Sequence, residues 1–140
     1  MNRRHELGLA DTNIIILFDQ LDLDELPGDI AVSAITLAEL SAGPHQTDDP
    51  VERAVRIRRL QDTEAAFEAL PFGVQAARTF GQMAAAVIAA GRKPRGRTAD
   101  LMIASIAAAN RLPLYTINPA DFAGLDRLVE VVPVTHPDRR

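Results

Sequence analysis

Four acidic residues could form a catalytic centre: Asp11, Glu39, Asp100 and Asp121. Asp11 follows a short apolar strand, and the other three lie in the first turns of predicted helices. In an open parallel sheet, these positions share the edge where ligands bind. Carboxylates that face one another repel unless a cation separates them, and oxygen ligands without Cys or clustered His favour Mg²⁺, or Mn²⁺ as the alternative. The pattern predicts a hydrolytic metal site with a phosphodiester substrate.

Each of the helix-start acids also has a purely structural interpretation. Thr36 and Glu39 have the spacing of a capping box, and Asp100 lies just inside a helix that Thr98 could cap. Asp121 stands third in a short helix that begins with an Asn-Pro pair, and the helix dipole favours acids in first turns. The prediction of a metal site therefore depends on all four acids occurring together.

Short apolar strands separated by helices predict an α/β domain with a mostly parallel central sheet flanked by helices. Apolar runs predict strands at 7–10, 30–32, 113–116 and 129–134. Helical spacing predicts helices at 36–41, 50–70, 74–90 and 98–109, the third with Gly91 at its carboxyl end, and a short helix from 118. We expect one domain over 1–140, with the acids at the carboxyl edge of the strands and 136–140 as a loose tail.

The composition limits the class of protein. The chain has 140 residues, 47% of them hydrophobic and 24% charged, with a formal charge of −4, which indicates one globular domain. No apolar run is long enough to span a membrane, and no signal-peptide pattern follows the basic start, so we expect a cytoplasmic protein. Because there is no Cys, disulfides, thiolate zinc sites and cysteine nucleophiles are excluded.

A basic loop precedes Asp100 and supplies Arg92, Lys93, Arg95 and Arg97. These cations could bind the phosphates of a nucleic acid, or they could form a solvated linker whose charge offsets the acidic surface. Aromatic residues make up only 4% of the chain, so stacking platforms for bases are scarce. If the protein binds a nucleic acid, we expect it to contact the backbone rather than stack on bases.

From about residue 7 to 134 the chain resembles a PIN domain, specifically the VapC-type toxins of bacterial toxin–antitoxin pairs. Four segments in the same order carry the resemblance: Leu9–Asn13, Ser33–Leu40, Arg97–Ala104 and Leu114–Phe122. The resemblance implies a Mg²⁺-dependent endoribonuclease that arrests growth or translation. It also implies a homodimer and a cognate protein antitoxin that covers the site.

The resemblance assigns residues to the site by position. Asp11, Glu39 and Asp100 match the three acids that such enzymes place around Mg²⁺. The fourth polar position is open between Asn118 and Asp121.

Two hydroxyl residues also match the family's pattern. Thr12 and Thr116 resemble hydroxyls that line the site, although each could be an ordinary turn or strand residue.

Two other functions share this scaffold. One is a housekeeping PIN-like nuclease or another metal phosphohydrolase. The other is a catalytically inactive domain that binds RNA or protein, in which the acids only cap helices.

Overall fold

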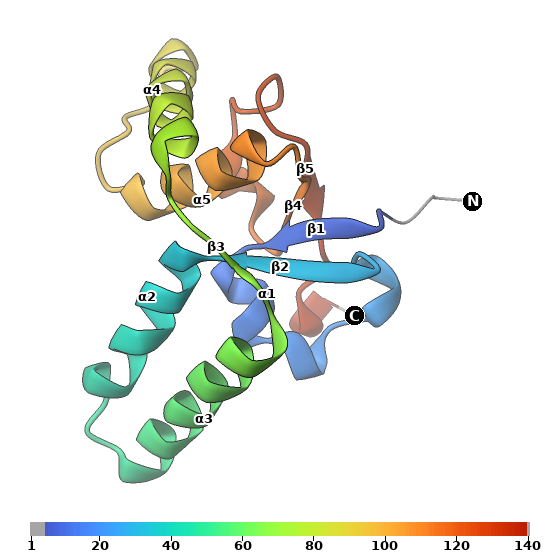
Figure 1. Ribbon diagram of the computed structural model, residues 1–140, viewed down its shortest axis with the longest axis vertical. Coiled ribbons are helices and arrows are strands. Elements are labelled where there is room, and N and C mark those ends of the chain that lie inside the picture. Colours follow the sequence, from blue (N-terminus) through green and yellow to red (C-terminus); the bar gives the residue numbers. More distant parts are fainter. Residues whose placement is uncertain (1–4, 140) are drawn as a thin grey trace.

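Five parallel strands form the central sheet of the computed structural model, which describes residues 5–139 (Figure 1). The strands are β1 (Leu7–Ala10), β2 (Asp29–Ser33), β3 (Ala69–Leu70), β4 (Leu114–Thr116) and β5 (Val131–Pro133). Their order is β3-β2-β1-β4-β5, so the chain builds outward on one side of β1 and then crosses to the other. Ligands bind at such a reversal, outside the carboxyl ends of the strands, which here are those of β1 and β4.

Helices cover both faces of the sheet (Figure 1). The α-helices are α1 (Thr12–Ile16), α2 (Ala34–Ala42), α3 (Pro50–Ala66), α4 (Val74–Ala89) and α5 (Thr98–Ala109). The short 3-10 helices are η1 (Phe18–Gln20), η2 (Leu23–Glu25), η3 (Gly43–Gln46), η4 (Pro119–Phe122) and η5 (Pro137–Arg139). Helices α4 and α5 pack together on one side of the sheet, and α2 and α3 extend from the other (Figure 1).

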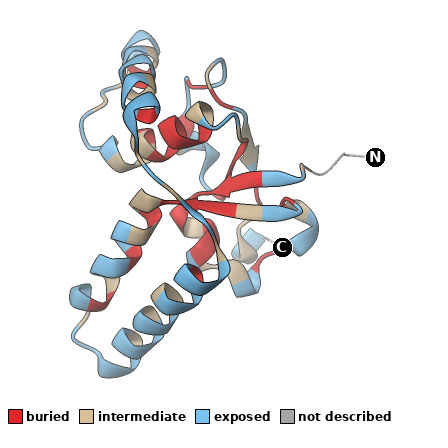
Figure 2. Cartoon of the chain, in the orientation of Figure 1, coloured by how far each residue is buried: buried red, intermediate tan, exposed pale blue. Residues whose placement is uncertain are grey.

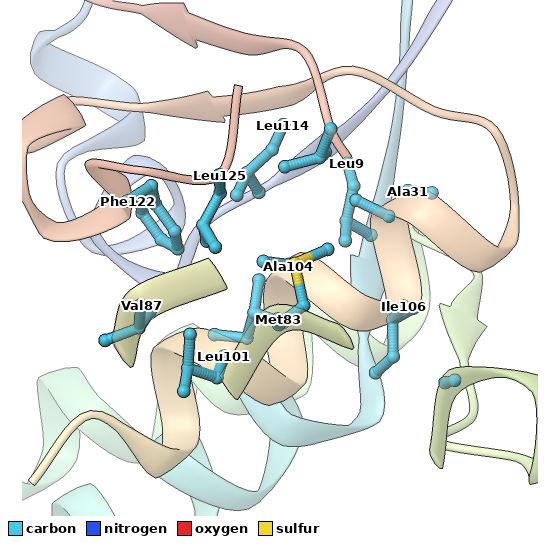
Figure 3. Close-up of a cluster of buried hydrophobic side chains, with 14 residues drawn as sticks. Leu9, Ala31, Met83, Val87, Leu101, Ala104, Ile106, Leu114, Phe122 and Leu125 are labelled. Carbon is cyan, nitrogen blue, oxygen red and sulfur yellow. The ribbon is translucent and has the colours of Figure 1, made fainter. Parts of the chain in front are cut away.

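Alternating side chains of the strands divide the core into two clusters. Leu9 packs toward α4 and α5, where Met83 and Leu101 are buried (Figure 3). The next residue, Ala10, packs in the opposite cluster with Ile14. Burial follows the sheet and the inner faces of the helices (Figure 2). Each large apolar side chain buried in this way contributes roughly 1.5–3 kcal/mol, and together they fix the carboxyl ends of the strands.

The parallel α/β sheet is confirmed, but the helix predicted over 50–70 is wrong at its end. Helix α3 stops at Ala66, and β3 then pairs with β2, with Val32 opposite Ala69. The amide of Val32 donates a 3.1 Å hydrogen bond to the carbonyl of Glu68. A strand of two residues is too short to show a period-2 pattern, so the sequence pattern assigns the apolar residues of β3 to the preceding helix.

The cap predictions for α2 and α5 are also wrong. Ser33, not Thr36, caps α2, because its hydroxyl accepts a 3.0 Å hydrogen bond from the Thr36 amide. The residue before α5 is Arg97, which makes no side-chain cap, so Thr98 is already helical. The capping box therefore does not exist, and Glu39 lies beyond the first turn of α2. Gly91 is confirmed after α4, with a φ of +76° that suits glycine.

The carboxyl-terminal elements are shorter than predicted. The last strand covers Val131–Pro133, and the short helix near Asn118 is the 3-10 helix η4. The predicted loose tail contains η5, while Arg140 lies outside the described residues, as do residues 1–4. In the part of the chain that is described, no helix is long and apolar enough to cross a bilayer.

Candidate active site

Asp11 stands at the end of β1 and is only 4% exposed. Its Oδ1 caps α1 by accepting a 2.8 Å hydrogen bond from the Thr12 amide. Its Oδ2 accepts hydrogen bonds from the Thr116 hydroxyl at 2.8 Å and from the Asn13 amide at 3.1 Å. Burial nevertheless raises the pKa of Asp11, and the charges of Glu39 and Asp121 raise it further, against the lowering effect of the bonds from Thr116 and Thr12. Asp11 is thus a tightly held carboxyl that a nearby cation would stabilise in its ionised form.

Glu39 is held from α1 although it lies on α2. The Thr12 hydroxyl donates a 2.7 Å hydrogen bond to Glu39 Oε1, and it lies 2.9 Å from the hydroxyl of Thr36. A carboxylate can only accept hydrogen bonds, so the Thr12 hydroxyl uses its single hydrogen in the bond to Glu39. The Thr36 hydroxyl must therefore be the donor in its hydrogen bond with Thr12. Ser33 donates to Thr36 at 3.3 Å, so a chain of three buried hydroxyls ends at the exposed Glu39 carboxylate.

Asp100 and Asp121 complete the acidic group from α5 and η4. Burial raises the pKa of Asp100 from its ordinary value of 3.8 to about 6, with further contributions from the charges of Asp11, Asp121 and Glu39. The Arg97 guanidinium opposes this rise. The charges of the other three acids therefore act on Asp100, which places all four predicted acids within electrostatic range.

The donor set suits a hard divalent cation. The acids and their hydrogen-bond partners offer carboxylate, hydroxyl and amide groups, and oxygen ligands of this kind favour Mg²⁺ over zinc. Across residues 5–139, however, no three acidic or histidine side chains form a ready-made metal-binding group. The acids thus lie within electrostatic range of one another without closing into a compact ligand cluster.

The other candidate residues divide into those that contact the acids and those that do not. Thr12 and Thr116 contact Glu39 and Asp11 directly through their hydroxyls. Asn118 is exposed, and its backbone amide donates to the Thr116 hydroxyl at 3.0 Å. Thr116 and Asn118 therefore belong to one connected turn, with only the threonine bonded to an acid.

The basic loop is attached to η4, which carries Asp121. Arg92 Nη1 donates to the carbonyl of Ala120 at 3.0 Å, and Arg97 Nη1 approaches the carbonyl of Asp121 at 3.4 Å. Lys93 and Arg95 are exposed. The loop thus supplies two anchoring arginines and two solvent-facing cations beside the acidic group.

Sequence reasoning missed three polar residues that support the acids. Asn13 contacts both Asp11 and Thr116, the latter at 3.3 Å. Thr36 and Ser33 extend the hydroxyl chain behind Thr12. The available signal was their position close to Asp11 and Glu39 in the sequence; Asn13 is half-buried, and Ser33 and Thr36 are buried.

Residues 9–128 match the family model of the PIN domain. The chain belongs to the PIN-domain family. Over 127 residues this PIN domain is 35% identical to Ribonuclease VapC5 of Mycobacterium tuberculosis (strain ATCC 25618 / H37Rv), a match that covers 89% of this chain and 91% of that protein. It is therefore a PIN domain of the VapC type.

Solved structures agree with this assignment. A VapBC-5 toxin–antitoxin structure from Mycobacterium tuberculosis superimposes with a TM-score of 0.80 at 34% identity, covering 94% of this PIN domain and 99% of that chain. VapBC-1 from nontypeable Haemophilus influenzae gives a TM-score of 0.70 at 26% identity, covering 89% and 96% of the two chains. The similarity thus extends over nearly the whole length of each protein.

Proposed function

We propose that this protein is a Mg²⁺-dependent endoribonuclease toxin that acts in the cytoplasm until a cognate antitoxin neutralises it. The observation that carries the proposal is the gathering of four carboxyls at the β1–β4 edge, where the charges of three of them add to burial in raising the pKa of Asp100. A divalent cation would relieve that repulsion. The family match and the name of the M. tuberculosis relative support RNA as the substrate.

Asp11, Glu39 and Asp100 would hold Mg²⁺, with Mn²⁺ as the alternative. When bound, the cation would polarise a phosphoryl oxygen and lower the pKa of a bound water. Glu39 Oε1 is engaged by Thr12, while Oε2 accepts no hydrogen bond from any described residue. Oε2 is therefore free to accept a proton from the attacking water.

We assign the fourth polar position to Asp121 rather than Asn118. The charge of Asp121 contributes to the raised pKa of both Asp11 and Asp100. Asn118 contacts the group through its backbone amide, which donates to Thr116. Asp121 thus adds negative charge where a cation would bind, whereas Asn118 shapes the turn.

The basic loop would bind RNA phosphates next to the acids. Lys93 and Arg95 face solvent, and Arg97 already acts on the pKa of Asp100. Cations placed beside a catalytic carboxylate group offset its repulsion of an anionic substrate. Arg92 would contribute mainly by fixing the loop to η4.

A groove between α1, η1 and α3 suits a protein partner such as the antitoxin. Its volume is about 390 Å³, and its lining includes Ile15, Phe18, Val55 and Phe67. Val55 on α3 is 46% exposed, and Ile16 at the end of α1 is 43% exposed. Apolar side chains exposed on neighbouring elements are typical of protein-binding surfaces.

We also propose a homodimer. Helix α4 exposes Val74 and Ile88, at 68% and 61%, on a surface outside the acidic site. Light scattering after size exclusion measures the mass directly, and a monomer at micromolar concentration would refute this part.

Turnover of RNA by the purified protein tests the enzyme. We expect cleavage with Mg²⁺, none with EDTA, and none from a folded Asp100→Asn variant. Cleavage that persists in EDTA would refute the metal site, and no cleavage under any condition would favour the inactive binding domain.

Expression in a bacterial host tests the biological role. A toxin arrests growth, and co-expression of its antitoxin restores growth. A housekeeping nuclease would leave growth unchanged.

A further inference from the structure

A second groove opens beside the acidic site, between α1, α2 and α3. Its volume is about 350 Å³, and Thr12 and Glu39 line it together with Arg56 and Arg59 of α3. A cavity of this size lies at the lower end of the range for small-ligand sites, which begins at about 300 Å³. Because Glu39 belongs both to the groove and to the acidic group, a ligand bound at the acids can continue into the groove.

Arg59 differs from the other arginines of α3. Arg53 donates to two backbone carbonyls of the connection between α2 and α3, at 3.1 and 2.8 Å. Arg56 pairs with Glu52 at 3.0 Å and donates to the carbonyl of Gly43 at 2.9 Å. Arg58 lies 3.9 Å from a carboxylate one turn along the helix. Among residues 5–139, no group accepts a hydrogen bond or ion pair from the Arg59 guanidinium.

An anion is the ligand that this arrangement lacks. Arg59 is half-buried, and its guanidinium pairs with no carboxylate of residues 5–139. Its planar fork of donors matches phosphate oxygens, which it can bind with two parallel hydrogen bonds. In the same groove the charge of Arg56 is already balanced by Glu52. Arg59 is therefore the cation of this groove that can bind a phosphate without breaking an existing contact.

We propose that Arg59 binds a phosphodiester group of single-stranded RNA flanking the linkage that lies at the acids. This inference rests on the proposed function, because RNA at the acidic site must continue past Glu39. The groove then holds the strand in a fixed register, with one phosphate on Arg59 and the scissile phosphate at the carboxylates. Arg59 is a binding residue in this scheme and takes no part in proton transfer.

Binding measured without cleavage tests the proposal. The probe is a fluorescent 2′-O-methyl RNA of about ten nucleotides, a length within the site sizes of single-strand binders, and EDTA is present throughout. We expect Arg59→Gln to weaken binding about tenfold, the effect of losing one charged hydrogen-bonding contact. The slope of log K against log salt should fall by about 0.7, the value for one phosphate contact to a single strand. Arg59→Lys should recover part of the affinity.

Arg58→Gln is the matched control. It removes the same charge from the adjacent position of the same helix, but Arg58 is 84% exposed and does not line this groove. We expect its affinity for the probe to stay within about twofold of wild type, since a rim charge outside the groove makes no phosphate contact.

A scan with neutral methylphosphonate linkages locates the contact. Replacing one phosphate at a time should weaken wild-type binding at several positions. At one position, the replacement should weaken binding by wild type but have no effect on binding by Arg59→Gln. That loss of sensitivity identifies the phosphate that Arg59 binds, as in a double-mutant cycle.

Three results would overturn the inference: equal loss of affinity in Arg59→Gln and Arg58→Gln, a scan with no position specific to Arg59, or weakened binding of a partner protein with unchanged RNA binding. These measurements do not depend on turnover. A protein that shows the Arg59 coupling but never cleaves RNA would refute the proposed nuclease and leave this binding site in place.

Discussion

The hydroxyl of Thr116 donates a 2.8 Å hydrogen bond to Asp11 Oδ2 across 105 positions of sequence. The bond joins the carboxyl ends of β1 and β4, the two strands between which the order of the sheet reverses. It favours the ionised carboxylate and so opposes the effect of burial on the pKa of Asp11. The bond therefore links the topology of the sheet to the charge of the site.

Thr116→Val should raise the pKa of Asp11 further, because burial would then act without the bond that most opposes it. Mg²⁺ binding, measured by calorimetry near pH 6, should weaken. Thr116→Ser keeps the hydroxyl and should bind Mg²⁺ nearly as well as wild type. Equal affinities in the valine and serine variants would show that the bond does not control the charge of Asp11.

Asp100 should make the metal-free protein less stable as the pH rises from about 4 to 6. The folded protein keeps a proton on Asp100 up to about pH 6, whereas the unfolded chain releases it near 3.8. The folded state thus binds more protons in this window, so the free energy of unfolding falls as the pH rises. Denaturant unfolding in EDTA measures this slope.

Asp100→Asn is the control for that slope, which should become less steep because Asn does not titrate. Its melting temperature at pH 7 in EDTA should exceed that of wild type, since one of the repelling charges is gone. A slope identical to wild type would mean that Asp100 titrates normally.

Ser33→Ala should lower the free energy of unfolding by about 1 kcal/mol, the typical cost of losing an N-cap.

Glu39→Gln should leave the melting temperature nearly unchanged, because Glu39 does not cap α2. The same variant should lose RNA turnover, since an amide neither binds a cation as a carboxylate does nor accepts the proton of water. Full turnover by folded Glu39→Gln protein would remove Glu39 from the catalytic group.

The basic loop should separate into two functional pairs. Lys93→Gln with Arg95→Gln should reduce the salt dependence of RNA binding and leave the melting temperature unchanged, because both side chains face solvent. Arg92→Gln with Arg97→Gln should also lower the melting temperature, since these arginines contact the carbonyls of η4. Identical effects of the two pairs on stability would contradict this division.

The acids at strand ends were predictable because parallel β/α units place those positions at one edge. Their number and spacing sufficed to locate Asp11, Asp100 and Asp121 near one another. The role of Glu39 was harder to predict, because its spacing from Thr36 imitates a capping box. The structure removes the cap interpretation, because Ser33 caps α2 and Glu39 contacts Thr12 instead.

Other features depend on contacts that no local pattern records. Strand β3 has two residues and exists because β2 offers it a partner. The bond between Asn13 and Thr116 joins residues 103 positions apart. Local propensity predicts long, strongly periodic elements well, whereas short strands and second-layer polar contacts are decided by tertiary packing.

Because β4 contributes Thr116 and η4 contributes Asp121, the acidic group needs residues from both ends of the chain. A nascent polypeptide still on the ribosome has Asp11 and Glu39 long before it has the last quarter of its sequence. Such pairings at long sequence separation form late, after the intervening chain has been ordered. A chain that ends before Thr116 would therefore lack both Asp121 and the hydroxyl that holds Asp11.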